Sequence, residues 1–223
     1  MKYIVVDFEM NPVSGIYNEQ KAICTNEIIQ IGAVLLDENY EERDSFRTYV
    51  KPRFSEKLRR NIVSLTGITD DMLQHAPEFP DALKAFFGWC SCCGDKVQII
   101  QWSESDYSQV AGEIRQKNYI LTDQEKPLMV GWHDFQKEYG EVIGAEREMS
   151  LSNAVMLAGK DFEGKQHDAL YDARNTARIF RTVRIPEERQ KSMGKVSEVL
   201  KGSRPLAASL GDMFDFSKLC VAV

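Results

Sequence analysis

The sequence predicts an α/β fold with a mixed β-sheet. Three apolar, β-rich segments come first in the chain, and only a short polar turn separates the second from the third. A fourth apolar segment follows a long helical stretch, and further helical segments come after it. Strands that come first and then alternate with helices are typical of a sheet that combines antiparallel and parallel pairs.

Four segments have the composition of strands. They are Tyr3–Val6, Ile28–Leu36, Ser45–Val50 and Val97–Trp102. The turn at Asn39–Glu42 is too short for a crossover, so we expect the second and third strands to form an antiparallel hairpin. Pro52 is expected to end the third strand because proline cannot donate to the ladder.

Apolar residues at helical spacing predict six helices. These are Ser55–Leu65, Asp81–Cys92, Ser105–Lys117, Asp134–Ile143, Leu151–Leu157 and His167–Val183. Pro80 stands just before the second of them, where proline commonly begins a helix. The last helix has the clearest periodicity.

Residues 1–185 are expected to form one domain, and residues 186–223 an appended helix, linker and tail. Glu187–Lys201 is charged and compatible with a helix, and Gly202–Pro205 has the composition of a linker. The tail beyond it carries apolar residues compatible with one face: Leu206, Leu210, Met213, Phe214, Phe216 and Leu219. Such a face needs a cover, either its own domain or, in a homodimer or complex, a second protein.

The composition favours a globular protein of the cytoplasm. Hydrophobic residues make up 43% of the chain and charged residues 28%. No run approaches the roughly 20 apolar residues of a membrane-spanning helix, so no membrane partner is expected. The five cysteines are an odd number, and Cys90, Cys92 and Cys93 lack the second pair that a structural zinc site needs. We expect reduced thiols at a helix end.

Two carboxylates end the first predicted strand. Asp7 and Glu9 are two residues apart, so both side chains point to one face while Val6 and Phe8 point to the other. Neighbouring carboxylates repel each other unless a cation intervenes, and Mg²⁺ and Mn²⁺ prefer oxygen ligands. Taken alone, the pair is weak evidence for a metal, because it often occurs by chance where a strand ends in solvent.

Asp106 follows the fourth predicted strand, in Trp102-Ser103-Glu104-Ser105-Asp106. Ligands of α/β sheets usually bind at the carboxyl ends of the strands. In the alternative interpretation Ser103 or Ser105 caps the next helix, and Asp106 lies in its first turn because of the helix dipole.

His167 and Asp172 begin the last predicted helix. Its apolar stripe comprises Leu170, Ala173, Ala177 and Phe180. Asp172 falls on the flank of this stripe, where a buried carboxylate needs a partner that a metal can supply. The unperturbed pKa of histidine, about 6.5, suits a base, although a polar residue before a helix is also common.

Three motifs follow one another along the chain: Asp-x-Glu, a mid-chain Asp after a strand, and His-x-x-x-x-Asp. In this order they resemble the motifs of the DEDDh exonuclease superfamily. This superfamily includes proofreading subunits of DNA polymerases, RNase T and RNA-trimming exonucleases. Glu27–Gly32, Leu65–Thr69 and His167–Ala173 are similar to further motifs of the superfamily, and the resemblance covers roughly residues 1–185. Trp102 followed by Asp106 is most similar to the free-standing RNA-trimming branch.

The resemblance implies an RNase H-like fold, with a mixed five-stranded sheet flanked by helices. It also implies hydrolysis from the 3′ end of RNA or single-stranded DNA by two Mg²⁺ or Mn²⁺ ions about 3.5–4 Å apart. Asp7 is expected to bridge the ions, Glu9 and Asp172 to complete the ion that activates water, and Asp106 to hold the second ion. His167 is expected to take the proton from the water.

Four residues are candidates to contact the substrate: Met10, Leu65, Thr66 and Trp102. For the first three, packing in the core is an equally good interpretation. Met10 stands where many members of the superfamily have Thr, and Gln30 replaces a common Glu. Neither difference removes a catalytic group.

Two alternative functions remain open. The chain is also compatible with a proofreading subunit whose apolar tail docks on a polymerase, or with a non-catalytic module that binds nucleic-acid ends. The net charge of −6 predicts weak affinity for long nucleic acid away from the site, because nucleic-acid binding usually requires a basic surface. Clustered metal ligands themselves contribute to this charge.

Overall fold

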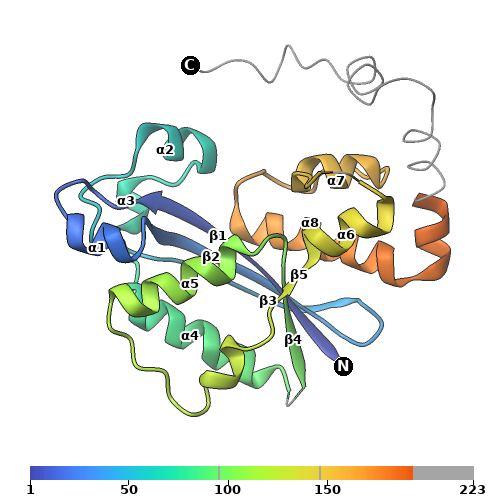
Figure 1. Ribbon diagram of the computed structural model, residues 1–223, viewed down its shortest axis with the longest axis horizontal. Helices are drawn as coiled ribbons and strands as arrows, with labels where there is room; N and C mark the ends of the chain where they lie inside the picture. The colour runs from blue at the N-terminus through green and yellow to red at the C-terminus, as the bar shows by residue number, and fades with distance from the viewer. Residues whose placement is uncertain (95, 146, 193–223) are drawn as a thin grey trace.

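A five-stranded mixed sheet forms the centre of the molecule (Figure 1). The computed structural model describes residues 1–94, 96–145 and 147–192, so the linker and the apolar tail lie outside the described residues. The strands are β1 (Lys2–Pro12), β2 (Asn26–Leu36), β3 (Glu42–Tyr49), β4 (Val97–Gln101) and β5 (His133–Asp134), in the order β3-β2-β1-β4-β5. β2 is antiparallel to both β1 and β3, whereas β4 is parallel to β1 and to β5. The predicted hairpin and mixed sheet are confirmed.

Helices cover both faces of this sheet. They are α1 (Asn18–Ile23), α2 (Arg60–Thr66), α3 (Asp70–Leu73), α4 (Phe79–Cys92), α5 (Ser105–Gln116), α6 (Phe135–Ile143), α7 (Leu151–Leu157) and α8 (Ala169–Arg184), with a 3-10 turn at Lys126–Met129. One core cluster packs α4 and α5 against the sheet, and a second packs α6, α7 and α8. Among the described residues, no helix is both long enough and apolar enough to cross a lipid bilayer.

The prediction that a helix begins at Ser55 is wrong, because α2 begins only at Arg60. The backbone N–H groups that a helix would use bond to side chains instead. Those of Leu58 and Arg59, which would bond to the carbonyls of Phe54 and Ser55, donate to the side chains of Asp70 and Asn11. The N–H groups of Arg53 and Phe54, just before the segment, donate to the Glu27 carboxylate. These partners hold the segment in an irregular conformation, since side-chain acceptors compete with helical carbonyls for N–H groups.

Further boundaries differ from the prediction. Strand β1 continues to Pro12, so Asp7 and Glu9 lie within it and not at its end, and β3 covers Glu42–Tyr49 instead of Ser45–Val50. Helix α8 begins at Ala169 instead of His167, because the Asp168 carboxylate caps it by accepting the N–H of Leu170. The fifth strand, β5, has only two residues, too few to show a period in the sequence. Residues 186–192 are helical, which agrees with the first part of the helix expected over Glu187–Lys201, and its remainder lies outside the described residues.

Alternation along β1 directs its two acidic residues away from the α4 side of the sheet. Val6 and Phe8 are buried in the cluster that contains α4. Asp7 and Glu9 therefore point to the other face, as predicted. Their partners on β2 are Gly32 and Gln30, and a bulge follows between Glu9 and Met10.

Helix α8 packs unusually close to β2 at Gly32. A Cβ atom on Gly32 would lie 2.2 Å from both the Ala169 carbonyl carbon and the Leu170 nitrogen, closer than real Cβ contacts. Gln30 adds a hydrogen bond, because its Oε1 accepts the Ala169 N–H at 3.1 Å. Since Gly32 and Gln30 pair with Asp7 and Glu9, the start of α8 is fixed directly beside these two carboxylates.

We expect Gly32→Ala to destabilise the protein and to reduce its activity together. The added methyl must push α8 away from β2, and overpacking of this kind costs about 1–3 kcal/mol. For a domain of this size, that corresponds to a fall in melting temperature of roughly 3–10 °C. Thermal unfolding followed by circular dichroism measures the change.

Gly88→Ala is the matched control for this substitution. Gly88 lies in α4, and a Cβ there would meet no atom within 4 Å. Alanine should therefore raise the stability by about 0.5–1 kcal/mol through helix propensity. An unchanged melting temperature in Gly32→Ala would contradict the close-packing argument.

Candidate active site

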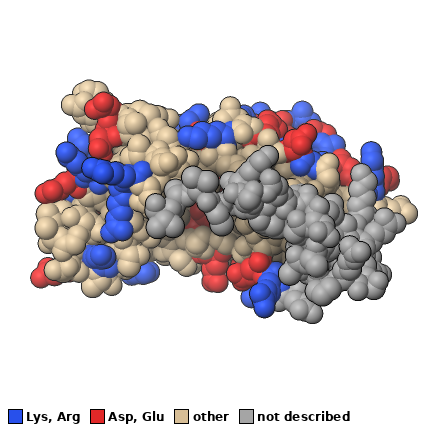
Figure 2. Space-filling model, turned by 90° about the horizontal axis from the view of Figure 1, so that it is seen from above, with Lys and Arg blue, Asp and Glu red and all other residues tan. Residues whose placement is uncertain are grey.

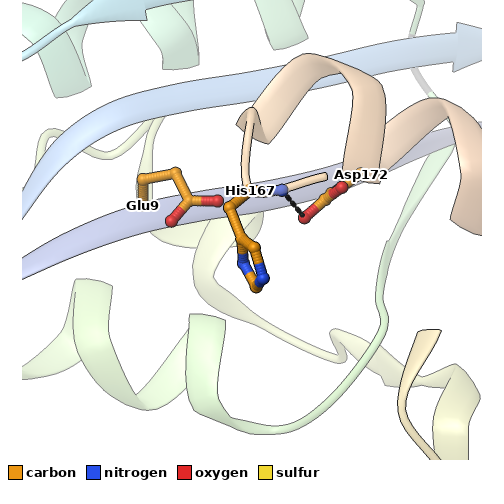
Figure 3. A group of neighbouring side chains, drawn as sticks. All are labelled: Glu9, His167 and Asp172. Atoms are coloured by element: carbon orange, nitrogen blue, oxygen red, sulfur yellow. Dashed lines mark hydrogen bonds between the residues drawn. The ribbon is translucent and has the colours of Figure 1, made fainter. Parts of the chain in front are cut away.

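Glu9, His167 and Asp172 lie together at the junction of β1 and the start of α8 (Figure 3). One potential ligand atom from each residue lies within 4.8 Å of the other two. The backbone N–H of His167 donates to Asp172 Oδ2 at 3.2 Å, which folds the chain before α8 back over the helix. His167 adopts a left-handed backbone conformation with φ of 61°, uncommon for a residue other than glycine.

Asp106 and Asp7 complete the acidic group. Asp106 lies in the first turn of α5, is buried, and accepts the N–H of Phe8 at 3.2 Å. That bond ties the carboxylate to the backbone between Asp7 and Glu9. The charges of Asp106, Asp172 and Glu9 each act on Asp7. The fold thus brings all five predicted catalytic residues into one region.

Burial and mutual repulsion raise the pKa values of these carboxyl groups. Burial, then the charges of Asp172 and Asp106, raises the pKa of Glu9 to about 8. Burial raises the pKa of Asp106 and of Asp172 to about 7 each, and raises that of Asp7 well above its usual range. A cluster of this kind stabilises a bound cation, because the cation replaces the repulsion with attraction.

The residues present fit divalent metal ions. Asp172 Oδ1 is buried and has no hydrogen-bond partner among the described residues. A buried carboxylate oxygen without a partner is costly, and a metal ion would satisfy it. The other donors are carboxylate oxygens too, which hard cations such as Mg²⁺ and Mn²⁺ prefer.

His167 is suited to accept a proton at neutral pH. Burial lowers its pKa, and the nearby charge of Lys165 lowers it further. The neutral form of the imidazole therefore predominates at neutral pH, and its unprotonated ring nitrogen can act as a base.

Lys165, which no pattern in the sequence indicated, links two parts of the site. Its ammonium donates to the Thr66 carbonyl at 2.8 Å, at the end of α2. A Cβ on Gly67 would lie 2.3 Å from Lys165 Nζ, so glycine leaves room for this contact. The bond joins the segment before His167 to α2.

A further group of polar residues orients the start of α8. Asp168 forms an ion pair with Arg47 at 2.6 Å, and Gln30 Nε2 approaches the same Asp168 oxygen at 3.5 Å. The Gln30 amide accepts from Ala169 and donates toward Asp168. A Glu at this position could only accept, which accounts physically for the presence of Gln. Its polarity within an apolar strand could have identified this role.

The four candidate substrate residues occupy different environments. Met10 is half-buried against the α4 cluster, and Leu65 is 47% exposed at the end of α2. Thr66 is buried, and its hydroxyl donates to the Ile62 carbonyl and accepts the Ile68 N–H. Trp102 packs with Phe135 and Tyr139 in the core, and its indole N–H donates to the Met149 carbonyl. Of these four, Leu65 presents the most open surface.

The cysteines near the end of α4 are free thiols. Cys90 and Cys93 are buried, Cys92 is exposed, and burial raises the pKa of Cys93 to about 11. The protonated thiol of Cys93 therefore predominates at neutral pH.

This geometry agrees with a known family. A family model described as Exonuclease (RNase_T) matches residues 4–180. The chain belongs to this exonuclease family. All five predicted catalytic residues lie within the matched region.

Among the curated relatives of this chain, 3′-5′ exoribonuclease 1 of Homo sapiens is 29% identical over 184 residues. That match covers 78% of this chain and 50% of the relative, so the chain spans about half the length of this relative. DNA polymerase III PolC-type of Bacillus subtilis (strain 168) is 27% identical, over 93% of this chain and 14% of the polymerase. A solved structure of the nuclease domain of 3′hExo, a DEDDh family member bound to rAMP, is 27% identical with a TM-score of 0.69. That match covers 82% of this chain and 90% of the other, and confirms the predicted fold.

We expect the metal-free protein to become more stable as the pH falls from about 8.5 to 6. Carboxyl groups with raised pKa values bind protons more tightly in the folded state than in the unfolded state. The destabilisation of the folded state by the ionised groups is therefore complete above pH 8 and is relieved as they are protonated. Differential scanning fluorimetry in EDTA measures the melting temperature across this range. Added Mn²⁺ should raise the melting temperature and weaken its dependence on pH.

Asp172→Asn should raise the melting temperature at pH 8.5 and weaken its pH dependence. Asp123→Asn is the control, since the Asp123 side chain is 95% exposed. A melting temperature that is constant or falls toward pH 6 in the metal-free wild type would contradict the electrostatic argument.

Proposed function

We propose that the chain is a metal-dependent 3′→5′ exonuclease that shortens single-stranded RNA or DNA. The observation that carries this proposal is the convergence of four buried or half-buried carboxylates beside His167. Similarity to an exoribonuclease and to the 3′hExo nuclease domain supports RNA as a substrate.

The carboxylates supply the negative charge that two Mg²⁺ or Mn²⁺ ions require. Asp7, Glu9, Asp106 and Asp172 would hold the ions, with Asp7 central because all three others act on it. Bound ions supply charge neutralisation of the phosphodiester and a more acidic water. The protein contributes rigidity, since Asp106 is tied to β1 and Asp172 to the His167 backbone.

His167 would remove the proton from the attacking water. Its left-handed backbone conformation places the imidazole beside Glu9 and Asp172. Its lowered pKa keeps the ring neutral at the pH where hydrolysis would occur. Lys165 supports this state through its charge and holds the preceding loop against α2.

Exposed Leu65, with Met10 near the end of β1, would contact the terminal nucleotide. An apolar side chain can pack against any base, so this contact would not select a sequence. Buried Thr66 would act indirectly, since its carbonyl holds Lys165. Trp102 would support the strand end from within the core.

We expect Asp172→Asn to abolish metal-dependent shortening of a 5′-labelled single-stranded oligonucleotide, because it removes one metal ligand without removing volume. Denaturing gels with Mn²⁺ measure the products, and Asp123→Asn should retain wild-type activity. Activity near that of the wild type in Asp172→Asn would rule out the metal assignment. Matched RNA and DNA oligomers in the same assay establish the preferred sugar.

His167→Ala should lose about 10²–10⁴-fold in turnover while still binding metal, since the residue acts as a base. The Mn²⁺-dependent rise in melting temperature reports metal binding independently of catalysis. A variant that keeps the wild-type rate and pH profile would place the base elsewhere. A variant that loses the metal-dependent stabilisation would make His167 a ligand.

A proofreading role is a second candidate, favoured by the similarity to DNA polymerase III PolC-type. It predicts preference for DNA and stimulation by a polymerase. The apolar tail, which lies outside the described residues, would be its docking segment. The assays on matched oligomers distinguish this role from RNA trimming.

A further inference from the structure

The segment from Arg53 to Arg60 presents four exposed cations. These are Arg53, Lys57, Arg59 and Arg60. Within the described residues none of them forms an ion pair, although other exposed cations such as Lys84 and Arg115 have none either. What distinguishes the segment is four cations within eight residues, with Glu56 as its one acidic residue. In a chain with a net charge of −6, a group of unpaired cations close together in sequence stands out.

Polar side chains, of which Glu27 and Asn11 are fully buried, fix the backbone of this segment. The Glu27 carboxylate accepts the N–H groups of Arg53 and Phe54 at 2.8 Å each. Asn11 accepts the N–H of Arg59 at 2.9 Å, and Asp70 accepts that of Leu58 at 2.9 Å. A backbone held in this way loses little entropy on binding a ligand, because it is already ordered.

The cationic segment is attached to the strand that carries the catalytic carboxylates. Asn11 is fully buried on β1, two residues beyond Glu9, or roughly 7 Å along the strand. Arg60 begins α2, which ends at Thr66 beside Lys165. Figure 1 shows α2 beyond the arrowhead of β1, and Figure 2 shows Lys and Arg gathered at that end of the molecule.

Two aromatic rings accompany these cations. Phe54 and Tyr17 are half-buried, with ring centroids 5.5 Å apart, and the Arg53 guanidinium lies 5.7 Å from the Phe54 centroid. The N–H of Ser14 donates to the Phe54 carbonyl at 2.9 Å, which holds the turn that carries Tyr17 against the segment. Cations interleaved with aromatic rings are the combination that binds single-stranded nucleic acid.

We propose that Arg53–Arg60 and Tyr17 form a binding surface for the single-stranded part of the substrate beyond the nucleotides in the active site. The cations would contact phosphates, and the rings would stack with a base. This inference rests on the proposed exonuclease function. It predicts that longer substrates are used better than short ones, and that the advantage depends on salt.

A variant in which all four cations become Gln tests the surface. On a 12-nucleotide oligo(U) with Mn²⁺, its kcat/KM should fall about tenfold or more through KM. The slope of log(kcat/KM) against log[salt] should decrease by up to about 3, because each phosphate contact on a single strand contributes roughly 0.7. Hydrolysis of the dinucleotide UpU should change less than about twofold.

Lys84→Gln with Arg115→Gln is the matched control, since both residues are exposed on α4 and α5. This variant should keep the wild-type kcat/KM and salt slope on both substrates. The inference is overturned if the fourfold variant keeps the wild-type values on the 12-mer. An equal loss on UpU and on the 12-mer overturns it too, because the segment would then support the geometry of the site.

Binding of the 12-mer to Asp172→Asn, measured by fluorescence anisotropy, separates this inference from the proposed function. If the wild type shortens no oligonucleotide, the proposed function fails. Binding that weakens about tenfold when the four cations are also replaced would still support the surface. Binding that is unaffected by their replacement would refute it.

Discussion

The contact of α8 with β2 at Gly32 is the constraint on which the site depends. β1 presents Asp7 and Glu9 opposite Gly32 and Gln30, and only a residue without a side chain lets the helix start so close to the strand. Gln30 then bonds the first turn of the helix, and Asp168 joins that turn to Arg47 on β3. Asp172, in the first turn of α8, therefore lies beside Asp7 and Glu9, which are 165 and 163 residues away in sequence.

Bringing these carboxylates together has an electrostatic consequence. Each is buried among like charges, so each pKa is raised and the metal-free site favours protons or cations. The backbone offsets part of this effect, since the N–H groups of Phe8 and His167 donate to Asp106 and Asp172. Asp106 and Asp172 also lie in the first turns of their helices, where the dipole stabilises negative charge. The same arrangement that destabilises the metal-free carboxylate cluster would favour the binding of divalent ions.

Local patterns in the sequence were sufficient to predict the first four strands, the face on which Asp7 and Glu9 lie, and the helix that carries Asp172. Each of these follows from a period of two or 3.6 residues and needs no distant partner. The expected helix at Ser55 failed because Asp70 and Asn11 take its first backbone donors, and such contacts between distant residues leave no period in the sequence. Lys165 was missed for the same reason, since its role depends on the Thr66 carbonyl 99 residues away. The ordered motifs indicated which residues belong together, and the fold supplied the distances between them.

Net charge is a poor guide to the surface that a substrate meets. Several of the acidic residues behind the value of −6 are buried, among them Glu9, Glu27, Asp106 and Glu113. Glu27 and Glu113 both pair with buried Lys117, so little of their charge reaches the solvent. Arg53, Lys57, Arg59 and Arg60, by contrast, are exposed. Glu27 connects these two features, because the same buried carboxylate that binds Lys117 holds the backbone of the exposed cations. An acidic protein can thus present a locally basic surface beside an acidic site, provided that the negative charges are placed inside.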